Sequence, residues 1–350
     1  MMKFLVRTLY IILISLFFSF ITQLPKIHFA KASEKSSLNI FVWGDFFPEE
    51  TFCKFEKETG IQLNISHYTS NEELILKLEK TKGEGYDLVF PSDYGVTALR
   101  EKGLLKPIDH TKLDFWARLE PYLLDRPFDP KNQFSIPYFW EVYGIAFEKE
   151  KPLPHSLAAL FDGAHPIVMT ADPVEAMDFA AHYLYGYKHT LTLEEEQEVL
   201  TLLKKQKSRV EAYTDDRIHY IVSSENCPAA IMRVSFFWKA YNELSHLEIH
   251  LPKEGLFTTI ENVALAKGSK HEEAAYKFIN FVYKAECMAA QLELSPLFPA
   301  CRDALPLASF VTIPRYHEIF AEVQSRSDFF FTHYLIDPHR IRPFWVEVKL

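Results

Sequence analysis

The chain has little cysteine. Its four cysteines are too few for a disulfide scaffold, and their spacing does not match a zinc site: Cys53, Cys227, Cys287 and Cys301. Cys287 and Cys301 could pair in an oxidising compartment, and buried unpaired thiols fit the sequence equally well. The fourteen histidines form no His-Glu-x-x-His motif, and no Gly-x-Ser-x-Gly elbow occurs. The sequence therefore offers no motif for a metal, a cofactor or a serine hydrolase.

Only one hydrophobic run is long enough for use in a membrane, and it lies at the N-terminus. Lys3 and Arg7 precede an apolar stretch over 9–21, and 30–32 reads Ala-Lys-Ala. A basic start, an apolar run and a small-x-small motif are typical of an export signal, here cut after Ala32. An uncleaved anchor is the alternative. No cysteine stands at the cleavage site, so no lipid is implied.

Positive charge is also scarce in the mature chain. Loss of residues 1–32 removes four basic residues and takes the net charge from -9 to -13: Lys3, Arg7, Lys26 and Lys31. An acidic exported protein is a poor nucleic-acid binder and attracts cations weakly over long range. The remaining residues exceed a typical single domain, which predicts two lobes with separate cores.

Strand and helix patterns alternate along the first part of the mature chain. The expected strands cover 38–43, 61–68 and 86–90, and the expected helices cover 49–59, the segment capped by Ser70 and Asn71, and 93–102. This alternation predicts an α/β fold with a parallel sheet and right-handed crossovers.

A proline-rich connection after Gly103 separates these elements from a second α/β unit. The expected strands of the second unit cover 166–169 and 229–234, and its helices cover 174–185, 193–205 and a segment from 236. A strand over 259–266 then leads to a helical stretch over 270–292. The return of the chain after Gly255 thus follows a second, separate run of elements.

Two of the early strands end in an aromatic ring beside a carboxylate. Trp43, Asp45 and Phe46 follow the first strand, and Ser92, Asp93 and Tyr94 follow the third. Ligands of open α/β sheets sit at the carboxyl ends of strands, and rings with carboxylates suit an organic cation.

Local roles are the alternatives for these residues. Trp43 fits a core tryptophan, Tyr94 a partly buried ring, Ser92 a helix N-cap, and Asp45 a turn beside Gly44. Only their joint placement at strand ends favours a binding site.

The second unit supplies further acids at the start of a helix. Asp172 fits an N-cap, Pro173 the first helical position, and Glu175 lies three residues after the cap. A helix N-terminus favours ionised carboxylates, so capping and ammonium binding are compatible.

Several motifs together resemble the periplasmic spermidine/putrescine-binding proteins of polyamine importers. The resemblance covers most of the mature chain, and its motifs cover 41–48, 57–61, 68–72, 85–94, 127–130, 135–138, 252–255 and the helix with 278–281. It implies a type II periplasmic-binding-protein fold, in which each lobe is a mainly parallel sheet flanked by helices and the ligand lies in the interlobe cleft. The first lobe would comprise 37–141 and 261–305, and the second 144–257 and 308–350.

The resemblance also implies a set of ligand contacts. Asp172, Glu175 and Glu261 would hold ammonium groups, Trp43, Phe46 and Tyr94 would pack on methylenes, and Asp45, Ser92 and Asp93 would assist. Three ring positions of the family pattern are occupied differently here, by Met232, Thr259 and Pro296, with Phe298 near the last. Arg233 is unfavourable in a cation pocket unless it points away or pairs with an acid.

The resemblance thus implies a monomeric, non-enzymatic binding protein that delivers a linear polyamine to the membrane permease and ATPase of an ABC importer in the periplasm, without a cofactor. The alternative within the fold is another solute, such as a different cationic amine, an amino-acid derivative or an iron complex, with Arg233 facing an anion. An exported hydrolase using paired carboxylates and a signalling receptor lobe are less favoured, because Asp172 and Glu175 are close in sequence and no signalling domain is evident.

Overall fold

Strand and helix alternate at the start of the described chain. The computed structural model describes residues 36–44, 46–150, 153–214, 221, 229–239, 246–309 and 314–350, so the expected export signal and Asp45 lie outside the described residues. The first elements are β1 (Ser37–Trp43), α2 (Glu49–Thr59), β2 (Gln62–Tyr68), α3 (Asn71–Thr81), β3 (Leu88–Val89), α4 (Asp93–Glu101) and β4 (Leu105–Lys106). Ser70 caps α3 by accepting a hydrogen bond from the Glu73 amide at 3.2 Å. The predicted order is confirmed, although β3 is shorter than expected.

Four short 3₁₀ turns occupy the proline-rich connection before a long strand begins. They cover His110–Lys112, Trp116–Arg118, Pro121–Leu123 and Pro130–Asn132. The strand that follows, β5 (Ser135–Glu148), is buried over nearly its whole length. A strand that is apolar at almost every position is typical of the middle of a sheet.

The second run of elements follows β5. It comprises α5 (Ala158–Phe161), β6 (Ile167–Met169), α6 (Pro173–Tyr185), α7 (Leu193–Lys207), β7 (Val210–Tyr213), β8 (Ala229–Arg233), α9 (Val234–Lys239) and β9 (Leu247–His250). The predicted strand at 229–234 and the helix after it are confirmed, with the helix beginning at Val234, two residues earlier than expected.

The chain then returns through β10 and ends in helices. The remaining elements are β10 (Leu256–Ala266), α10 (Glu272–Val282), α11 (Ala285–Leu294), β11 (Phe298–Pro299), a 3₁₀ helix (Arg302–Leu307), α12 (Pro314–Ser325), β12 (Phe329–Phe331) and α13 (Pro338–Lys349). Before β10, Gly255 has φ 155°, and a Cβ there would lie 1.9 Å from the Phe330 ring, so only glycine fits.

The expected helical stretch over 270–292 is confirmed and consists of two helices, α10 and α11. Lys284 has extended backbone angles and breaks the run between α10 and α11. The preceding residue, Tyr283, is buried, its ring stacks on Phe115 with centroids 3.7 Å apart, and its hydroxyl donates to the Pro137 carbonyl at 2.8 Å. Tertiary anchoring of Tyr283 therefore overrides the local helical pattern.

One path of hydrogen-bonded strands runs β2-β1-β3-β10-β5-β8-β6-β7. β1 is parallel to β2 and β3, and β6 is parallel to β7 and β8, but β10 is antiparallel to β3 and β5. The sheet is therefore mixed, which corrects the expectation of mainly parallel sheets. Along this path the long strands β5 and β10 run antiparallel to each other and to β8 and β3, a feature that local sequence patterns do not reveal.

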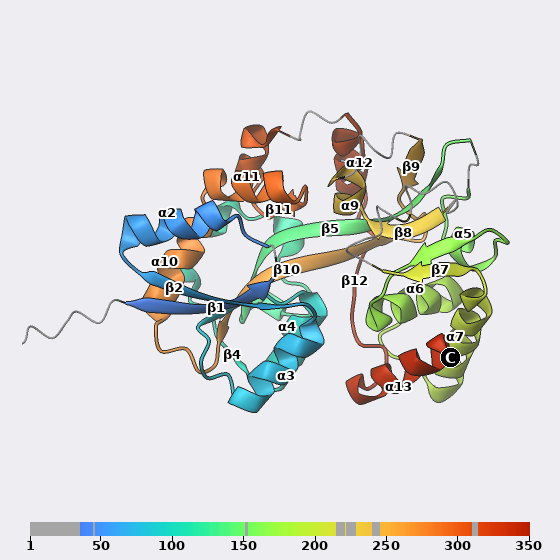
Figure 1. Ribbon diagram of the computed structural model, residues 1–350, viewed down its shortest axis with the longest axis horizontal. Coiled ribbons are helices and arrows are strands. Elements are labelled where there is room, and N and C mark those ends of the chain that lie inside the picture. Colours follow the sequence, from blue (N-terminus) through green and yellow to red (C-terminus); the bar gives the residue numbers. More distant parts are fainter. Residues whose placement is uncertain are drawn as a thin grey trace, which may run out of the picture. The chain divides into compact units, whose positions relative to one another are not determined.

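Helices cover both faces of the strands. Figure 1 shows α2 and α10 on one side of β1 and β2, with α3 and α4 on the other, and α6, α7 and α13 grouped beside β7. β5 and β10 run between these two groups of elements (Figure 1). None of the helices in the described ranges has the length and apolar content to span a bilayer.

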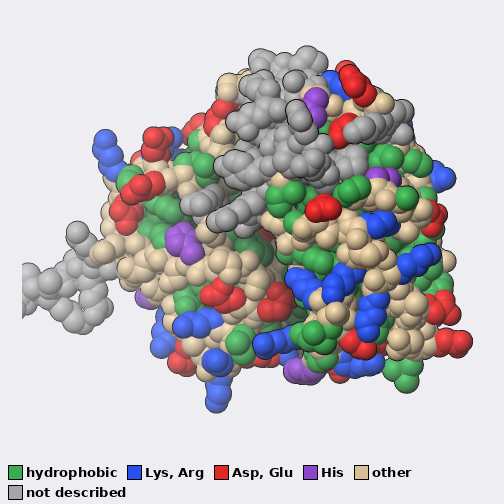
Figure 2. Space-filling model, turned by 45° about the vertical axis from the view of Figure 1, so that its right-hand side comes forward, with side chains coloured by type: hydrophobic (Ala, Val, Ile, Leu, Met, Phe, Trp, Pro, Cys, Tyr) green, Lys and Arg blue, Asp and Glu red, His purple; other side chains and the backbone are tan. Residues whose placement is uncertain are grey.

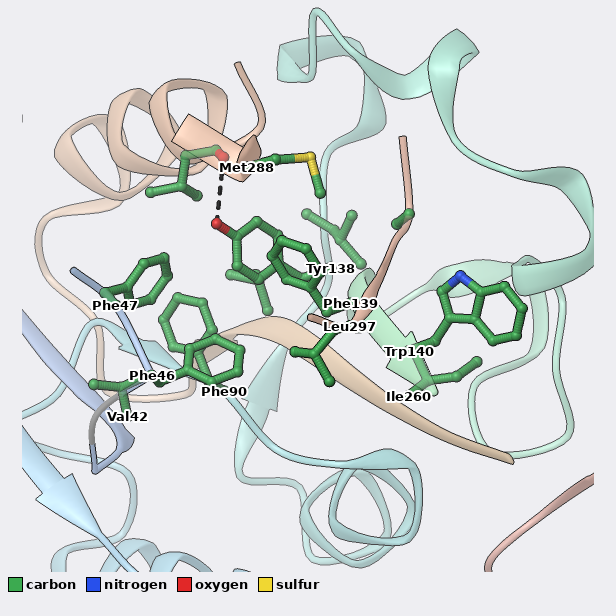
Figure 3. Packing of buried hydrophobic residues seen from close by; sticks show 14 of the residues in the cluster. Val42, Phe46, Phe47, Phe90, Tyr138, Phe139, Trp140, Ile260, Met288 and Leu297 are labelled. Carbon is green, nitrogen blue, oxygen red and sulfur yellow. Dashed lines mark hydrogen bonds between the residues drawn. The ribbon is translucent and has the colours of Figure 1, made fainter. Parts of the chain in front are cut away.

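The buried side chains form two hydrophobic clusters. The first includes Phe47, Phe55 and Tyr138, and the second includes Phe179 and Leu203 from the helices beside β6. Figure 3 shows the aromatic part of the first cluster, in which Phe46, Phe47, Phe90 and Tyr138 lie together. The first cluster also includes Val168 of β6 and Met232 of β8, so it extends across both groups of elements.

Three cysteines are free thiols. Cys287 and Cys301 are buried and do not pair with each other, and Cys53 is exposed. Burial raises the pKa of the Cys287 thiol to about 11 and that of Cys301 to about 12, so both are neutral. Cys227 lies outside the described residues.

Charge is unevenly distributed over the surface. On the face drawn in Figure 2, Lys and Arg side chains gather right of centre, whereas acidic side chains are scattered. The negative net charge therefore does not make this face uniformly acidic.

Candidate functional site

A β-bulge places Glu261 at the candidate site. The register between β10 and β5 shifts between Glu261 and Asn262, opposite Pro137 and Phe139. Pro137 has no amide hydrogen to donate, so a regular ladder is broken at this point. The Asn262 amide instead donates to the Pro91 carbonyl at 2.9 Å, and Glu261 forms an isolated bridge with Ser92. The bulge thus brings an acid of β10 against the end of β3.

Two side chains from the early strands hold the Glu261 carboxylate. Trp43 Nε1 donates to Oε2 at 2.8 Å, and Ser92 Oγ donates to Oε1 at 2.8 Å. Ser92 is the N-cap residue of α4 but makes no capping hydrogen bond with its side chain. Trp43 is half-buried and packs against Tyr68. The strand-end residues therefore converge on one carboxylate.

The environment of Glu261 disfavours its charge. Burial raises the pKa of Glu261 to about 7, even though Arg233, Ser92 and Trp43 act in the opposite direction. The side chain is nevertheless partly exposed. A ligand cation beside Glu261, in addition to Arg233, would stabilise the ionised carboxylate, because opposite charges attract most strongly in a low-dielectric site.

Asp93 adds a buried carboxylate with an unused oxygen. Its Oδ1 accepts a hydrogen bond from the Tyr94 amide at 2.9 Å, while Oδ2 has no hydrogen-bond partner among the described residues. Burial raises the pKa of Asp93 well above its usual value, and Glu261 and Glu175 add to this effect. A buried acceptor without a donor is rare in folded proteins and suits a ligand N–H.

Asp172 has two roles in the structure. Its Oδ1 accepts hydrogen bonds from the amides of Val174 at 2.8 Å and Glu175 at 3.3 Å, which confirms the N-cap prediction for α6. Its Oδ2 accepts a hydrogen bond from the Tyr94 hydroxyl at 2.9 Å. This bond joins α4 to the N-terminus of α6 and keeps the second oxygen directed toward the strand-end residues.

The charge on Asp172 is also disfavoured. Burial raises the pKa of Asp172 well above its usual value, and the carboxylates of Glu175 and Glu72 raise it further. Asp172 remains partly exposed. The two acids that a ligand can reach, Asp172 and Glu261, therefore both lack sufficient positive charge nearby.

Glu175 is buried and its carboxylate is occupied by protein groups. Thr170 Oγ1 donates to Oε2 at 2.7 Å, the Tyr143 hydroxyl donates to Oε1, and Arg233 donates to Oε1 at 2.9 Å. Glu175 therefore does not complete a capping box with Asp172. The sequence-based prediction that Glu175 binds a ligand amine stays a prediction.

Arg233 pairs with acids, which is one of the two arrangements that would make it compatible with a cation pocket. Besides Glu175 it contacts the Tyr143 hydroxyl through Nε at 2.7 Å and lies 3.9 Å from Glu141. Glu141 is buried and accepts a hydrogen bond from the Ser235 hydroxyl, and burial raises its pKa. The guanidinium is thus enclosed by two carboxylates and a phenol.

Three residues expected at the site lie mainly in the interior. Phe46 is 9% exposed and packs among Phe47, Phe90 and Tyr138, as Figure 3 shows. Met232 is 2% exposed and belongs to the first hydrophobic cluster. Thr259 is buried opposite Glu141 on β5. Their predicted ligand contacts stay predictions, as do those of Asp45, whose position is outside the described residues.

Phe298, which lies near the Pro296 position where the family pattern has an aromatic ring, is also a core residue. Phe298 is fully buried in β11, where it packs against Trp140 and Trp238. Its neighbour Pro296 is buried as well. Phe298 therefore contributes to packing of β11 on β5.

Several residues that surround the acids were not predicted from the sequence. Glu141 and Tyr143 of β5 line the Arg233 pair, and the Tyr334 ring packs edge-on against Tyr94 with centroids 5.4 Å apart. A detectable signal existed for Glu141, because it is a single acid within an otherwise apolar run over 135–147. Tyr334 had no such signal.

A cavity of about 820 Å³ is lined by Tyr334 but by none of Glu261, Asp93, Asp172 and Glu175. Its walls include Arg100, Arg126, His333 and Phe331. Arg100, Arg126 and Arg340 outnumber the acids Glu101 and Asp337 in its lining, so it suits an organic cation less well than the group of acids around Glu261 and Asp172.

Comparison with known proteins defines the class. Residues 50–316 match the model of the bacterial extracellular solute-binding proteins. The spermidine/putrescine-binding periplasmic protein of Salmonella typhimurium is 31% identical over 263 residues, which cover 73% of this chain and 75% of that protein. A candidate spermidine/putrescine ABC transporter structure from Listeria monocytogenes has a TM-score of 0.78 and 28% identity, covering 90% of this chain and 99% of that one.

The fold by itself does not select a solute. An iron-bound protein from Pseudomonas aeruginosa has a TM-score of 0.60 and 20% identity, covering 76% of this chain and 87% of that one. At this identity the likeness concerns the fold alone.

The mixed α/β fold and the family match therefore define a bacterial extracellular solute-binding protein, a transport component and not an enzyme. Within this class, the chain belongs to the family of the spermidine/putrescine-binding periplasmic proteins.

Proposed function

We propose that this chain is the solute-binding component of an ABC importer and that it binds a linear polyamine. The observation that carries the proposal is the group of acids around the ends of β1 and β3 and the start of α6, where Trp43 and Ser92 donate to Glu261, Tyr94 donates to Asp172, and burial and neighbouring carboxylates raise the pKa values of Glu261, Asp93 and Asp172. A cluster of acids with too little compensating charge binds cations.

The ring faces beside the acids favour an alkyl cation. The ammonium groups would be held by Glu261 and Asp172, with Asp93 and Ser92 assisting, and the methylenes would pack against Trp43 and Tyr94. Asp45, Phe46, Met232 and Thr259 would complete the surroundings. An inorganic cation would gain nothing from the two rings.

Two lobes would close on the ligand. One would comprise 37–141 and 261–305 and the other 144–257 and 308–350, with β5 and β10 as the connecting strands. The Tyr94–Asp172 hydrogen bond would then join the lobes in a closed form, as in other hinge-closing proteins.

The names of the related proteins support a membrane permease and an ATPase as partners of this component. In the periplasm, after removal of residues 1–32, the closed monomer would be recognised by a membrane permease driven by an ATPase. An anionic solute is less supported than a polyamine, because Arg233 is already paired with Glu175 and Glu141.

A thermal-shift panel tests the proposal. The mature chain is heated with putrescine, spermidine, spermine, agmatine or amino acids at increasing concentrations. The true ligand raises the melting temperature progressively, because it binds only the folded state. A lack of any shift with every polyamine at millimolar concentration would contradict the proposal.

A further inference from the structure

The cavity beside Tyr334 is built from segments that lie far apart in the sequence. It has a volume of about 820 Å³, and its walls come from α4, the proline-rich connection, the segment between α6 and α7, and the chain from β12 to α13. Two contacts join the last two segments: the Leu191 amide donates to the Leu335 carbonyl at 2.9 Å, and His333 Nε2 lies 2.8 Å from the Lys188 carbonyl oxygen. Tertiary contacts therefore hold this wall together.

Aromatic rings line the cavity. β12 consists of three consecutive phenylalanines, Phe329, Phe330 and Phe331, and none of them is fully buried. Neighbouring residues of a strand face opposite sides, so one hydrophobic core does not cover all three rings. Tyr187, which is 42% exposed, stacks on Phe330 with ring centroids 5.4 Å apart. The cavity thus offers apolar ring surface to a molecule that enters it.

Arg126 supplies positive charge that no described acid neutralises by an ion pair. Its guanidinium carbon lies 5.5 Å from the centre of the Phe331 ring, and its Nε is buried without a hydrogen-bond partner among the described residues. Burial lowers the pKa of Arg126, although the carboxylate of Asp125 acts in the opposite direction. A partly desolvated cation of this kind gains strongly from a nearby anion.

A second arginine without an ion pair in the described ranges lines the same cavity. Arg100 lies in the last turn of α4 and is partly buried. Arg340 differs, because it already donates to Glu196 at 2.8 Å. The two acids of the lining, Glu101 and Asp337, are exposed, and Asp337 caps α13. The lining therefore carries more positive than negative charge.

We propose that this cavity is a second ligand site, which takes an organic anion with a carboxylate or phosphate group and an aromatic body. Arg126 would pair with the oxyanion, and Arg100 would add positive charge to the same cavity. Guanidinium groups form charge-assisted hydrogen bonds with both kinds of oxyanion. Because the Arg126 guanidinium lies against the Phe331 ring, an anion paired with it would have its aromatic body beside the rings of β12. The proposal does not depend on polyamine binding.

Two matched pairs of probes test the charge and the ring separately. 3-Phenylpropionate and 3-phenylpropan-1-ol differ in the carboxylate, and phenyl phosphate and inorganic phosphate differ in the ring. Each probe is titrated into the mature chain in a chloride buffer and followed by calorimetry. We expect at least one of the two aromatic anions to bind with one molecule per chain, at least about 10-fold more tightly than its matched partner.

Single variants locate the bound anion. Arg126→Gln should weaken binding of the tighter anion at least about 5-fold, and Arg100→Gln at least about 3-fold. Arg342→Gln, at an exposed arginine of α13 that does not line the cavity, is the control for net charge and should leave binding unchanged. Glu261→Gln should also leave it unchanged, because Glu261 does not line the cavity. Melting temperatures show that each variant is folded, and Arg100→Gln decides the test if Arg126→Gln is not.

The outcomes separate this proposal from the proposed function. Tight binding of only one aromatic anion supports the proposal and identifies the oxyanion. Binding of neither, or binding of both no tighter than that of their matched partners, overturns it. Binding that a folded Arg126→Gln variant leaves unchanged also overturns it, as does loss of binding in Glu261→Gln, because the anion would then lie elsewhere. None of these results bears on putrescine binding, which is measured independently.

Discussion

Trp43 Nε1 donates a hydrogen bond to Glu261 Oε2 at 2.8 Å, although 218 residues separate the two along the chain. The bond joins the end of β1 to β10 at the register shift opposite Pro137 and Phe139 of β5, and it fixes the orientation of the carboxylate. It also leaves the ring of Trp43 half-buried beside the acid. A ring face and an oriented carboxylate are thus provided by one contact.

Replacement of the indole donor should weaken binding more than it weakens the fold. Trp43→Phe keeps a ring but removes the N–H, so the Glu261 carboxylate loses one of its two hydrogen-bond donors. We expect the dissociation constant for putrescine to rise about 3- to 10-fold, measured by calorimetry. Trp116→Phe is the control. The Trp116 ring stacks on His110 within the proline-rich connection, so this variant should leave putrescine affinity unchanged.

Binding should depend on pH through Glu261. The pKa of Glu261 is raised from 4.5 to about 7 in the empty folded protein. Between pH 4.5 and pH 7, Glu261 is therefore mostly protonated in the folded state and mostly ionised in the unfolded state. Stability of the empty protein should therefore fall as the pH rises from 4.5 to 7. An ammonium ligand requires the ionised acid, so ligand binding should release protons.

The melting-temperature shift with putrescine reports this coupling. It should grow between pH 5 and pH 8, because below the pKa of about 7 the ligand must displace a proton. Glu261→Gln should abolish most of this pH dependence. A shift that is constant over the range, or that grows toward acid pH, would show that Glu261 does not bind the cation.

Two substitutions at Asp172 separate capping from ligand binding. Asparagine caps helices about as well as aspartate, whereas alanine does not. Asp172→Asn should therefore keep most of the stability but lose at least about 10-fold in polyamine affinity, since it removes the charge. Asp172→Ala should lose affinity and, in addition, about 1 kcal/mol of unfolding free energy in urea titration. If Asp172→Asn binds normally, the residue is only a cap.

Asp87 provides a change that affects stability without affecting binding. Burial alone would raise its pKa, but hydrogen bonds from Asn39, His271 and Ser269 outweigh this effect and keep the pKa below its usual value. Asp87 therefore stabilises the fold above its unfolded pKa, and this contribution is lost as the pH falls. Asp87→Asn should lower the free energy of unfolding by about 2 kcal/mol. Its putrescine affinity, measured by calorimetry, should stay the same; a large loss would place Asp87 in the binding network.

Local patterns were sufficient to predict most elements. The helix expected at 49–59 is α2 with the same bounds, because Gly60 has φ 70° and ends it. The convergence of two strand ends also followed from the alternation of strand and helix. The break at Lys284 did not, because the buried contacts of Tyr283 come from residues far along the chain.

The direction of Arg233 could not be predicted from local sequence. Neighbouring residues of a strand face opposite sides, so either Met232 or Arg233 had to face the acids. Which one does is set by the register of β8 against β5, where Arg233 lies opposite Tyr143. The bulge at Glu261 likewise depends on Pro137, which is more than one hundred residues earlier. Such non-local pairings decide the details of the site.

Calorimetric titration of the mature chain with putrescine, in parallel with its Glu261→Gln variant, tests the central claim most directly. Glu211→Gln, a change at an exposed acid on β7, is the control for net charge. The account predicts saturable binding of one putrescine per chain, unchanged by Glu211→Gln and weakened at least about 10-fold by Glu261→Gln. No binding of putrescine or any other linear polyamine at millimolar concentration, or binding that Glu261→Gln leaves intact, would contradict it.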